Sequence, residues 1–148
     1  MKSPALTLTG ARDALLSISK STESSGVPRA TLELVHLRVG QINGCSVCVD
    51  MHCRMLKKSG ESDERLFAIA AWRDAPYFND AERAALALAE ALTRIADSPD
   101  PVPDTIWNEA AKHFDETALA AILVAIANIN VWNRLNVATR AVAGHWKP

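Results

Sequence analysis

The sequence has little net charge and no long apolar run. Its 16 Lys and Arg residues nearly balance 17 Asp and Glu residues, which leaves a formal charge of −1 over 148 residues. Phosphate binding needs a basic surface excess, so this balance gives no reason to expect a nucleic-acid partner. The longest apolar run, Ala118 to Ala127, is well short of the roughly 20 residues that a membrane span needs. We therefore expect no membrane segment.

Cysteine is scarce as well, with three residues in the chain. This number does not make the disulfide framework of a secreted protein, and residues 1–16 lack the continuous apolar stretch of an export signal. We therefore expect a cytoplasmic location, where thiols are normally kept reduced. Any disulfide in such a protein is expected to have a working role.

The remaining composition is typical of one globular domain. Apolar residues make up 49% and charged residues 22% of the chain, which excludes a disordered protein. A chain of this length buries about two thirds of its unfolded surface without help from disulfides or metals. We expect residues 1–148 to form a single domain. Because no alternating run of β-branched residues occurs, the pattern predicts an all-α fold.

Turn-forming residues divide this all-α domain into about six to seven helices. Gly, Pro, Asn and Ser residues gather between the periodic stretches, where they favour turns. In the first expected helix, Leu15, Leu16 and Ile18 should face inward. The expected helices cover residues 9–23, 29–42, 46–58, 63–72, 79–96, 104–114 and 115–143, with Gly144 as the final stop.

The last expected helix is apolar on every side along its first half. Such a helix is buried either in the centre of the domain or against another subunit, so we expect a homo-oligomer. Buried amides need hydrogen-bond partners, which we expect either across a subunit contact or around a pocket. This requirement applies to four asparagines of the helix: Asn128, Asn130, Asn133 and Asn136.

The most informative stretch is residues 42–53. Cys45 and Cys48 stand at i and i+3, and His52 follows four residues after Cys48. At 3.6 residues per turn all three share one helical stripe, with neighbouring Cβ atoms roughly 5–6 Å apart. The Asn43-Gly44 turn sets both cysteines at a helix start, where free N–H groups favour a thiolate. The pattern therefore predicts a nucleophile, a resolving thiol and a base.

Two other interpretations compete with this one. Buried free cysteines are common core residues, so the thiols can be inert. A zinc site needs three or four ligands; Cys45, Cys48 and His52 supply three, but no second CxxC follows, and we expect no metal. A thioredoxin-type CxxC would need a βαβ context that the sequence lacks. The other histidines are scattered along the chain: His36, His113 and His145.

Two further residues lie near this stripe. Cys53 is about 140° round the helix from Cys48 and is expected to be a small core residue. Glu33 lies in the preceding helix on one stripe with Gly40, a residue that costs helix stability and so indicates close approach of another backbone. If the two helices pack antiparallel, Glu33 reaches His52, orients its ring and raises its basicity. A solvated Glu33 near a helix start is the alternative.

One spacing joins these residues: Cys45 follows Glu33 by twelve positions, Cys48 follows by three more, and His52 by another four. In this spacing the chain resembles the alkylhydroperoxidase D-like, carboxymuconolactone decarboxylase superfamily. The similarity extends over nearly the whole chain and is closest to the small single-domain members. Two further strings support it: residues 71–78 and 128–136.

The resemblance implies an all-helical fold that assembles as trimers or hexamers, and a peroxidase reaction. It implies that Cys48 attacks an organic hydroperoxide and that Cys45 resolves the product as a disulfide. His52, with Glu33 behind it, would form the proton relay that activates Cys48. No bound cofactor is implied, and a dihydrolipoyl group or a dithiol protein would be the external reductant.

The sequence departs from the family pattern at three positions and leaves other functions open. Alkylhydroperoxidase D carries a histidine where Val47 stands, Gly40 replaces a usual Ser or Ala, and Cys53 replaces a Thr or Ser. One alternative is a dithiol/disulfide redox adaptor or sensor that does not turn over peroxide itself. A second is a carboxymuconolactone-type decarboxylase, which does not need two cysteines, and a third is a purely structural oligomeric module.

Overall fold

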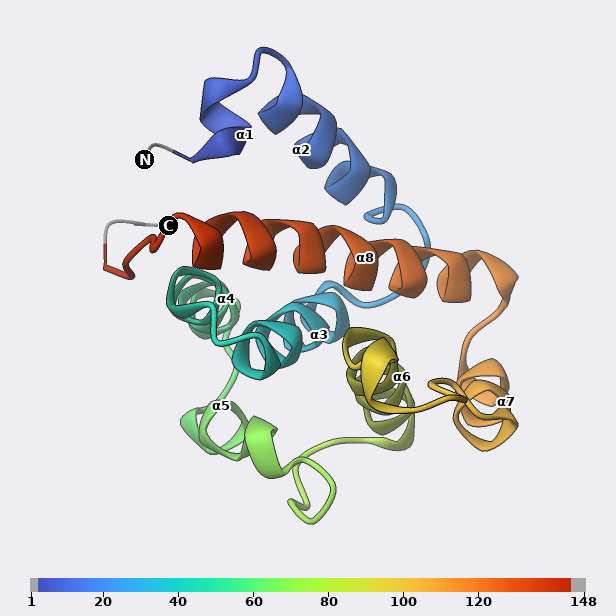
Figure 1. The fold of residues 1–148 in the computed structure, drawn as a ribbon. Helices are drawn as coiled ribbons and strands as arrows, with labels where there is room; N and C mark the ends of the chain where they lie inside the picture. Colours follow the sequence, from blue (N-terminus) through green and yellow to red (C-terminus); the bar gives the residue numbers. More distant parts are fainter. Residues whose placement is uncertain (1–2, 145–148) are drawn as a thin grey trace.

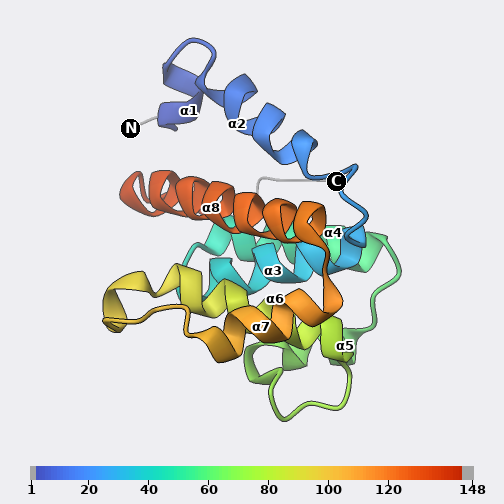
Figure 2. The same ribbon diagram turned by 90° about the vertical axis from the view of Figure 1, so that its right-hand side faces the viewer.

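Helix α8 (Glu116–Ala138) is the central element of the fold. In the computed structural model, which describes residues 3–144, it crosses the molecule with α1 and α2 on one side and the other helices on the opposite side (Figure 1). Seen after a quarter turn, α8, α3 and α6 follow one another in layers (Figure 2). The other elements are α1 (Pro4–Thr7), α2 (Ala11–Ser21), α3 (Arg29–Ile42), α4 (Ser46–Lys58), α5 (Asp63–Ala68), α6 (Asp80–Thr93), α7 (Asp104–His113) and the 3-10 turns Ile69–Ala71 and Ile95–Asp97.

The predicted all-α fold is confirmed, because no strand forms within residues 3–144. Helices α3 and α4 begin and end where the sequence predicts. The described part of the chain holds eight α-helices where six to seven were expected, since Pro4–Thr7 forms a single proline-opened turn that is too short to give a periodic signal. Two other expected helices are shorter, because their last turns tighten into 3-10 geometry at Ile69–Ala71 and Ile95–Asp97.

The prediction that Leu16 and Ile18 face inward is wrong. Both side chains are 41% exposed, and only Leu15 of the three is half-buried. Helix α2 contacts α8 through a narrow stripe, in which the amide of Asn128 donates to the Leu15 carbonyl at 3.1 Å and to Ser19 Oγ at 2.8 Å. Leu16 and Ile18 flank this stripe and therefore stay outside it.

Helix α8 ends at Ala138, five residues before the expected end near residue 143. Arg140 adopts a left-handed conformation with φ of 55°, the only non-glycine residue to do so within residues 3–144. The Arg140 N–H donates to the Val137 carbonyl and the Ala141 N–H to the Asn136 carbonyl, which makes a Schellman ending. The helix therefore ends just before the left-handed Arg140 and not at the expected Gly144. Because no glycine stands at position 140, the sequence gives no signal for this end.

The same helix corrects the expectation about membrane segments. Within residues 3–144, α8 is long and apolar enough to cross a bilayer by length and composition, although no single apolar run in it reaches that length. Just over half of its most apolar window is buried inside the fold, against α2, α3 and α6. A core helix passes the same test, so α8 is weak evidence for a membrane span.

A buried carboxylate joins α3 to α6. Glu90 accepts hydrogen bonds from Arg38 Nε at 2.7 Å, Arg73 Nη1 at 2.6 Å and Trp72 Nε1 at 3.0 Å. Burial alone would raise the pKa of Glu90, but these donors and the charge of Arg38 outweigh it and lower the pKa below its ordinary value. Arg38 therefore has a structural role, because its hydrogen bond to Glu90 holds α3 against α6.

We expect Arg140→Gly to raise the free energy of unfolding by about 1 kcal/mol, because glycine carries no Cβ penalty in the left-handed region. Urea unfolding followed by circular dichroism measures this difference. Arg140→Ala is the matched control, since it removes the side chain but keeps the Cβ, and it should give no gain. An equal gain in both variants would show that the arginine side chain, not the backbone, is the source.

Candidate active site

The turn between α3 and α4 presents the two cysteines. Gly44 has φ of 67°, whereas Asn43 stays in the right-handed region, so of the two turn residues only the glycine is left-handed. The Cys45 N–H donates to the Gly40 carbonyl at 3.0 Å and closes the end of α3. Cys45 is also the N-cap of α4, where its Sγ accepts the Cys48 N–H at 3.3 Å. One residue therefore ends one helix and begins the next.

Cys45 and Cys48 form a disulfide, with their Cα atoms 5.4 Å apart. Both residues are almost fully buried, at 2% and 1% exposure. The predicted i, i+3 geometry thus brings the sulfurs to bonding distance at a helix start. In this state neither sulfur is a free thiolate, so the alternative zinc set with His52 lacks two of its ligands.

Gly40 lets α4 approach α3 as the sequence predicts. A Cβ built on Gly40 would lie 3.4 Å from the Cβ of Cys48 and 3.5 Å from a methyl group of Val49. A methyl group would fill this space and any larger side chain would push Cys48 away. The close contact also accounts for a helix-weakening residue in the middle of α3.

The structure brings Glu33 to His52. Glu33 Oε2 lies 2.6 Å from Nδ1 of His52, and both side chains are buried between α3 and α4. Burial raises the pKa of Glu33, but the hydrogen bond and charge of His52, with smaller effects of His36 and Arg29, lower it below its ordinary value. Glu33 is therefore an ionised carboxylate that fixes the His52 ring, and the solvated alternative is wrong.

The other ring nitrogen of His52, Nε2, is buried and has no hydrogen-bond partner among the described residues. His52 stands one helical turn after Cys48, on the same stripe of α4. With Nδ1 engaged by Glu33, Nε2 is the nitrogen left to exchange a proton with the site.

Sequence analysis left His36 as a scattered histidine, but the structure sets it beside this pair. The His36 and His52 ring centroids are 4.9 Å apart, and Nδ1 of His36 lies 4.0 Å from Glu33 Oε2. Burial, and to a lesser extent the charge of His52, lowers the pKa of His36 to about 3, although Glu33 opposes the shift. His113 is exposed on α7, and His145 lies outside the described residues.

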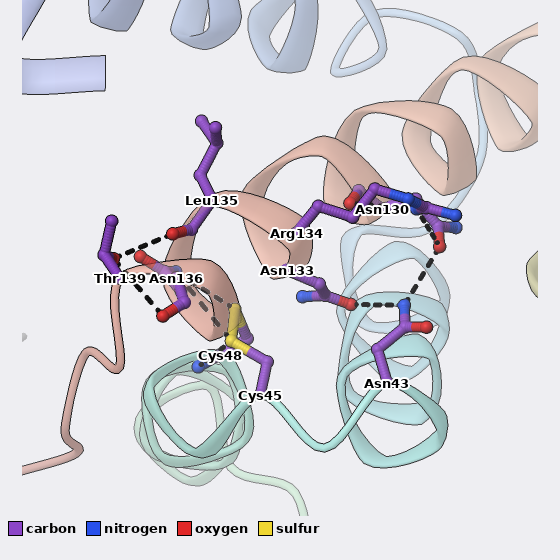
Figure 3. The surroundings of a disulfide bond; sticks show 9 residues. All are labelled: Asn43, Cys45, Cys48, Asn130, Asn133, Arg134, Leu135, Asn136 and Thr139. Carbon is purple, nitrogen blue, oxygen red and sulfur yellow. Dashed lines mark hydrogen bonds between the residues drawn. A yellow bond between two sulfur atoms is a disulfide. The ribbon is translucent and has the colours of Figure 1, made fainter. Parts of the chain in front are cut away.

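Asn136 of α8 is the site residue that sequence reasoning did not assign. Its side-chain amide lies 3.5 Å from Cys48 Sγ and 3.8 Å from Cys45 Sγ, within donating distance of both sulfurs (Figure 3). The polar residues of an otherwise apolar helix were the available signal, but which asparagine meets the sulfurs depends on how α8 crosses α4.

Two other asparagines of α8 hold the turn before Cys45. The Asn43 amide donates to Asn130 Oδ1 at 2.9 Å and to Asn133 Oδ1 at 2.8 Å (Figure 3). Partners for both amide oxygens are thus found within the chain itself, whereas Nδ2 of Asn133 is buried without a hydrogen bond among the described residues. A cavity of about 150 Å³ lies between residues 44–46 and residues 136–141, which are the end of α8 and the turn after it, and it borders Cys45.

Cys53 is a free, half-buried thiol that packs beside the core cluster around Leu56 and Leu34. Burial, together with the charge of Asp50, raises the pKa of Cys53. A raised thiol pKa means little thiolate at neutral pH, so Cys53 is poorly suited to attack or to exchange. This agrees with the predicted core position.

The chain matches known proteins over most of its length. The model of the carboxymuconolactone decarboxylase family matches residues 9–91. The uncharacterised protein YdfG of Bacillus subtilis is 36% identical over 124 residues, which cover 84% of this chain and 83% of YdfG. The crystal structure of ATU0492 from Agrobacterium tumefaciens, a protein of unknown function, has a TM-score of 0.87 and 32% identity and covers 96% of both chains.

A shorter match carries an enzyme name. Alkyl hydroperoxide reductase AhpD of a Bradyrhizobium species is 51% identical over 37 residues, which are 25% of this chain and 20% of that protein. The chain thus spans a small part of that enzyme at high identity, and most of YdfG and ATU0492 at lower identity.

The lowered pKa of His36 predicts an acid-dependent loss of stability. Below pH 6.5 the unfolded chain protonates this histidine, but the folded chain does so only near the folded pKa of about 3. The unfolded state therefore binds more protons, and stability falls with decreasing pH by up to about 1.4 kcal/mol per pH unit. His36→Gln should remove this contribution, which urea unfolding between pH 7.5 and 5 in a chelating buffer measures.

The exposed His113 is the control for this measurement, and His113→Gln should keep the pH dependence of the parent protein. The prediction concerns the slope against pH, so a constant loss of stability in His36→Gln does not affect it. Equal slopes in His36→Gln and the parent would contradict a buried, neutral His36.

Proposed function

Because this chain belongs to the carboxymuconolactone decarboxylase family, we propose that it is a CxxC thiol peroxidase that reduces organic hydroperoxides. The observation that carries the proposal is the buried Cys45–Cys48 pair at bonding distance, one helical turn from a histidine held by a carboxylate. Such a set supplies a nucleophile, a resolving thiol and a base within one hairpin of helices.

In the proposed cycle, His52 accepts the Cys48 proton through Nε2 while Glu33 holds Nδ1. The Cys48 thiolate attacks the O–O bond of the hydroperoxide, becomes a sulfenic acid and releases the alcohol, whose oxygen takes up a proton. The Cys45 thiol then attacks the Cys48 sulfur, releases water and forms the disulfide. An external dithiol returns both cysteines to thiols and leaves as a disulfide.

Two contacts favour Cys48 as the attacking thiol. Cys48 stands one helical turn before His52, the base of the proposed relay, and this local activator outweighs the start of α4, whose Cys48 N–H donates to Cys45 Sγ and favours charge there. The Asn136 amide is nearer to Cys48 than to Cys45, so its donated hydrogen bond favours charge on Cys48. Val47 packs against the core cluster, which leaves His52, Glu33 and Asn136 as the polar groups of the proposed mechanism.

The cavity supports Cys45 as the sulfur that the external reductant attacks. It borders Cys45 and not Cys48, so an incoming thiolate would meet the Cys45 sulfur and release Cys48 as the leaving thiolate. We propose a dihydrolipoyl group or a dithiol protein as this reductant. The same observation favours a second candidate function, a redox adaptor that exchanges disulfides without turning over peroxide.

We also propose that the chain assembles into a homo-oligomer, a trimer or a hexamer, in the cytoplasm. Apolar side chains stay exposed on the outer side of α8 and on α2, and a second copy would cover them. They include Val124, Val131, Val137, Leu16 and Ile18. A decarboxylase activity is the least supported candidate, because it gives the cysteine pair no role.

Cys48→Ser should abolish the consumption of cumene hydroperoxide in the presence of dihydrolipoamide. Cys45→Ser should keep one turnover per chain but lose the following ones, because no disulfide forms. His52→Gln should lower the rate about 100-fold or more, as loss of a general base does. Cys53→Ser is the matched control and should retain the parent rate. Full activity of Cys48→Ser would refute the proposal, and disulfide exchange without peroxide loss in the parent would select the adaptor.

Asn136→Leu should raise the pKa of the Cys48 thiol in the reduced protein by about one unit or more, since a hydrogen bond to a charged group contributes about 1.5–3 kcal/mol. The ultraviolet absorbance of the thiolate, followed against pH in a Cys53→Ser background, measures this shift. Asn128→Leu is the control, because Asn128 lies on the same helix but bonds to α2. An unchanged thiol pKa in Asn136→Leu would show that the amide only packs against the sulfurs.

A further inference from the structure

We infer that Glu33, His36 and His52 form a reversible binding site for a divalent transition metal of the zinc class. Each of the three residues offers a donor atom, and these atoms lie within 4.8 Å of one another. Neutral imidazole and carboxylate are the ligands that zinc takes from histidine and acidic residues. This set contains no cysteine and shares only His52 with the zinc site weighed from the sequence.

The fold supplies the three ligands from two helices. Glu33 and His36 stand at i and i+3 on α3, so one helical turn sets them on the same face. His52 comes from α4, which packs against α3 along its length. A metal bound here would join the two helices that also hold the cysteines.

The distance between Glu33 and His36 suits a metal between them. Glu33 Oε2 and His36 Nδ1 are 4.0 Å apart, which is too far for a hydrogen bond. Two bonds of about 2.0–2.2 Å to one zinc ion span this gap, and a small inward rotation of either side chain would bend them toward tetrahedral geometry.

Two unsatisfied nitrogens point to a missing partner. His36 Nδ1 and His52 Nε2 are both buried without a hydrogen bond among the described residues. Buried polar atoms are nearly always paired, and leaving one unpaired costs about 1–3 kcal/mol. The His52 side chain is 6% exposed, and those of Glu33 and His36 are 11% and 17% exposed, so His36 is the side of the cluster nearest to solvent.

Occupation of this site would switch off the proposed peroxidase, a consequence that rests on the proposed function. A metal on Nε2 of His52 takes the lone pair that accepts the Cys48 proton. A metal on Nδ1 displaces the Glu33 contact that orients the ring. Either way the relay stops, and a chelator restores it.

Metal binding is tested on the oxidised Cys53→Ser protein, in which no free thiolate exists and no peroxide is needed. Titration with Co²⁺ should give one equivalent with the visible absorbance of a nitrogen and oxygen site and no sulfur-to-metal charge transfer, and Zn²⁺ should displace the cobalt. His36→Gln should weaken binding at least 10-fold. His113→Gln, at the exposed Glu109–His113 pair on α7, should leave it unchanged.

Proton NMR of the histidine rings gives a second readout that needs no variant in the cluster. Zn²⁺ should shift the ring signals of His36 and His52 and leave those of His113 in place. The inference is overturned if His36→Gln binds Co²⁺ as tightly as the parent, or if Zn²⁺ leaves the His36 ring signals unmoved. Since neither readout involves turnover, absence of peroxidase activity would count against the proposed function alone.

Discussion

The close packing of α4 on α3 at Gly40 is the constraint on which the rest of the site depends. Without a side chain at this position, the Cβ of Cys48 lies against the backbone of α3. One turn later along α4, the same approach brings His52 within 2.6 Å of Glu33. A wider separation of the two helices would expose the cysteines and leave a buried histidine without its carboxylate. The glycine thus weakens one helix locally and permits the hydrogen bond between α3 and α4 that the proposed chemistry requires.

Helix α8 closes the third side of the site with polar groups. Burying amides in an apolar helix is costly unless they are paired, and here the pairing is directed at the cysteine turn. Asn130 and Asn133 hold Asn43, which ends α3, and Asn136 lies against both sulfurs (Figure 3). The left-handed Arg140 then stops the helix just past this contact. The asparagines therefore serve the position of the disulfide more than the stability of α8 itself.

The sequence predicts those parts of the molecule that short-range rules determine. The bounds of α3 and α4, the cysteine pair and the approach at Gly40 follow from helical period, turn residues and the conformational needs of glycine. The end of α8 does not, because an arginine occupies a conformation that glycine usually signals. The sulfur contact of Asn136 and the position of His36 beside His52 also escape prediction, since both depend on the angles at which helices cross. The exposed Leu16 and Ile18 show the same limit, because periodicity identifies an apolar face but not what covers it.

Under the proposed mechanism, the oxidised site carries a cost that reduction relieves. While the two sulfurs are bonded to each other, Nε2 of His52 has no partner among the described residues. Reduction restores a thiol on Cys48, one helical turn away, and this thiol offers a proton to that nitrogen. Asn136 acts in the same direction, because its amide bonds more strongly to a thiolate than to a disulfide sulfur. Groups that stabilise the dithiol make the disulfide easier to reduce, so under this mechanism they lower the demand on the external reductant. Reoxidation then relies on the weak O–O bond of the hydroperoxide, whose cleavage is favourable enough to re-form the disulfide and leave Nε2 unpaired again.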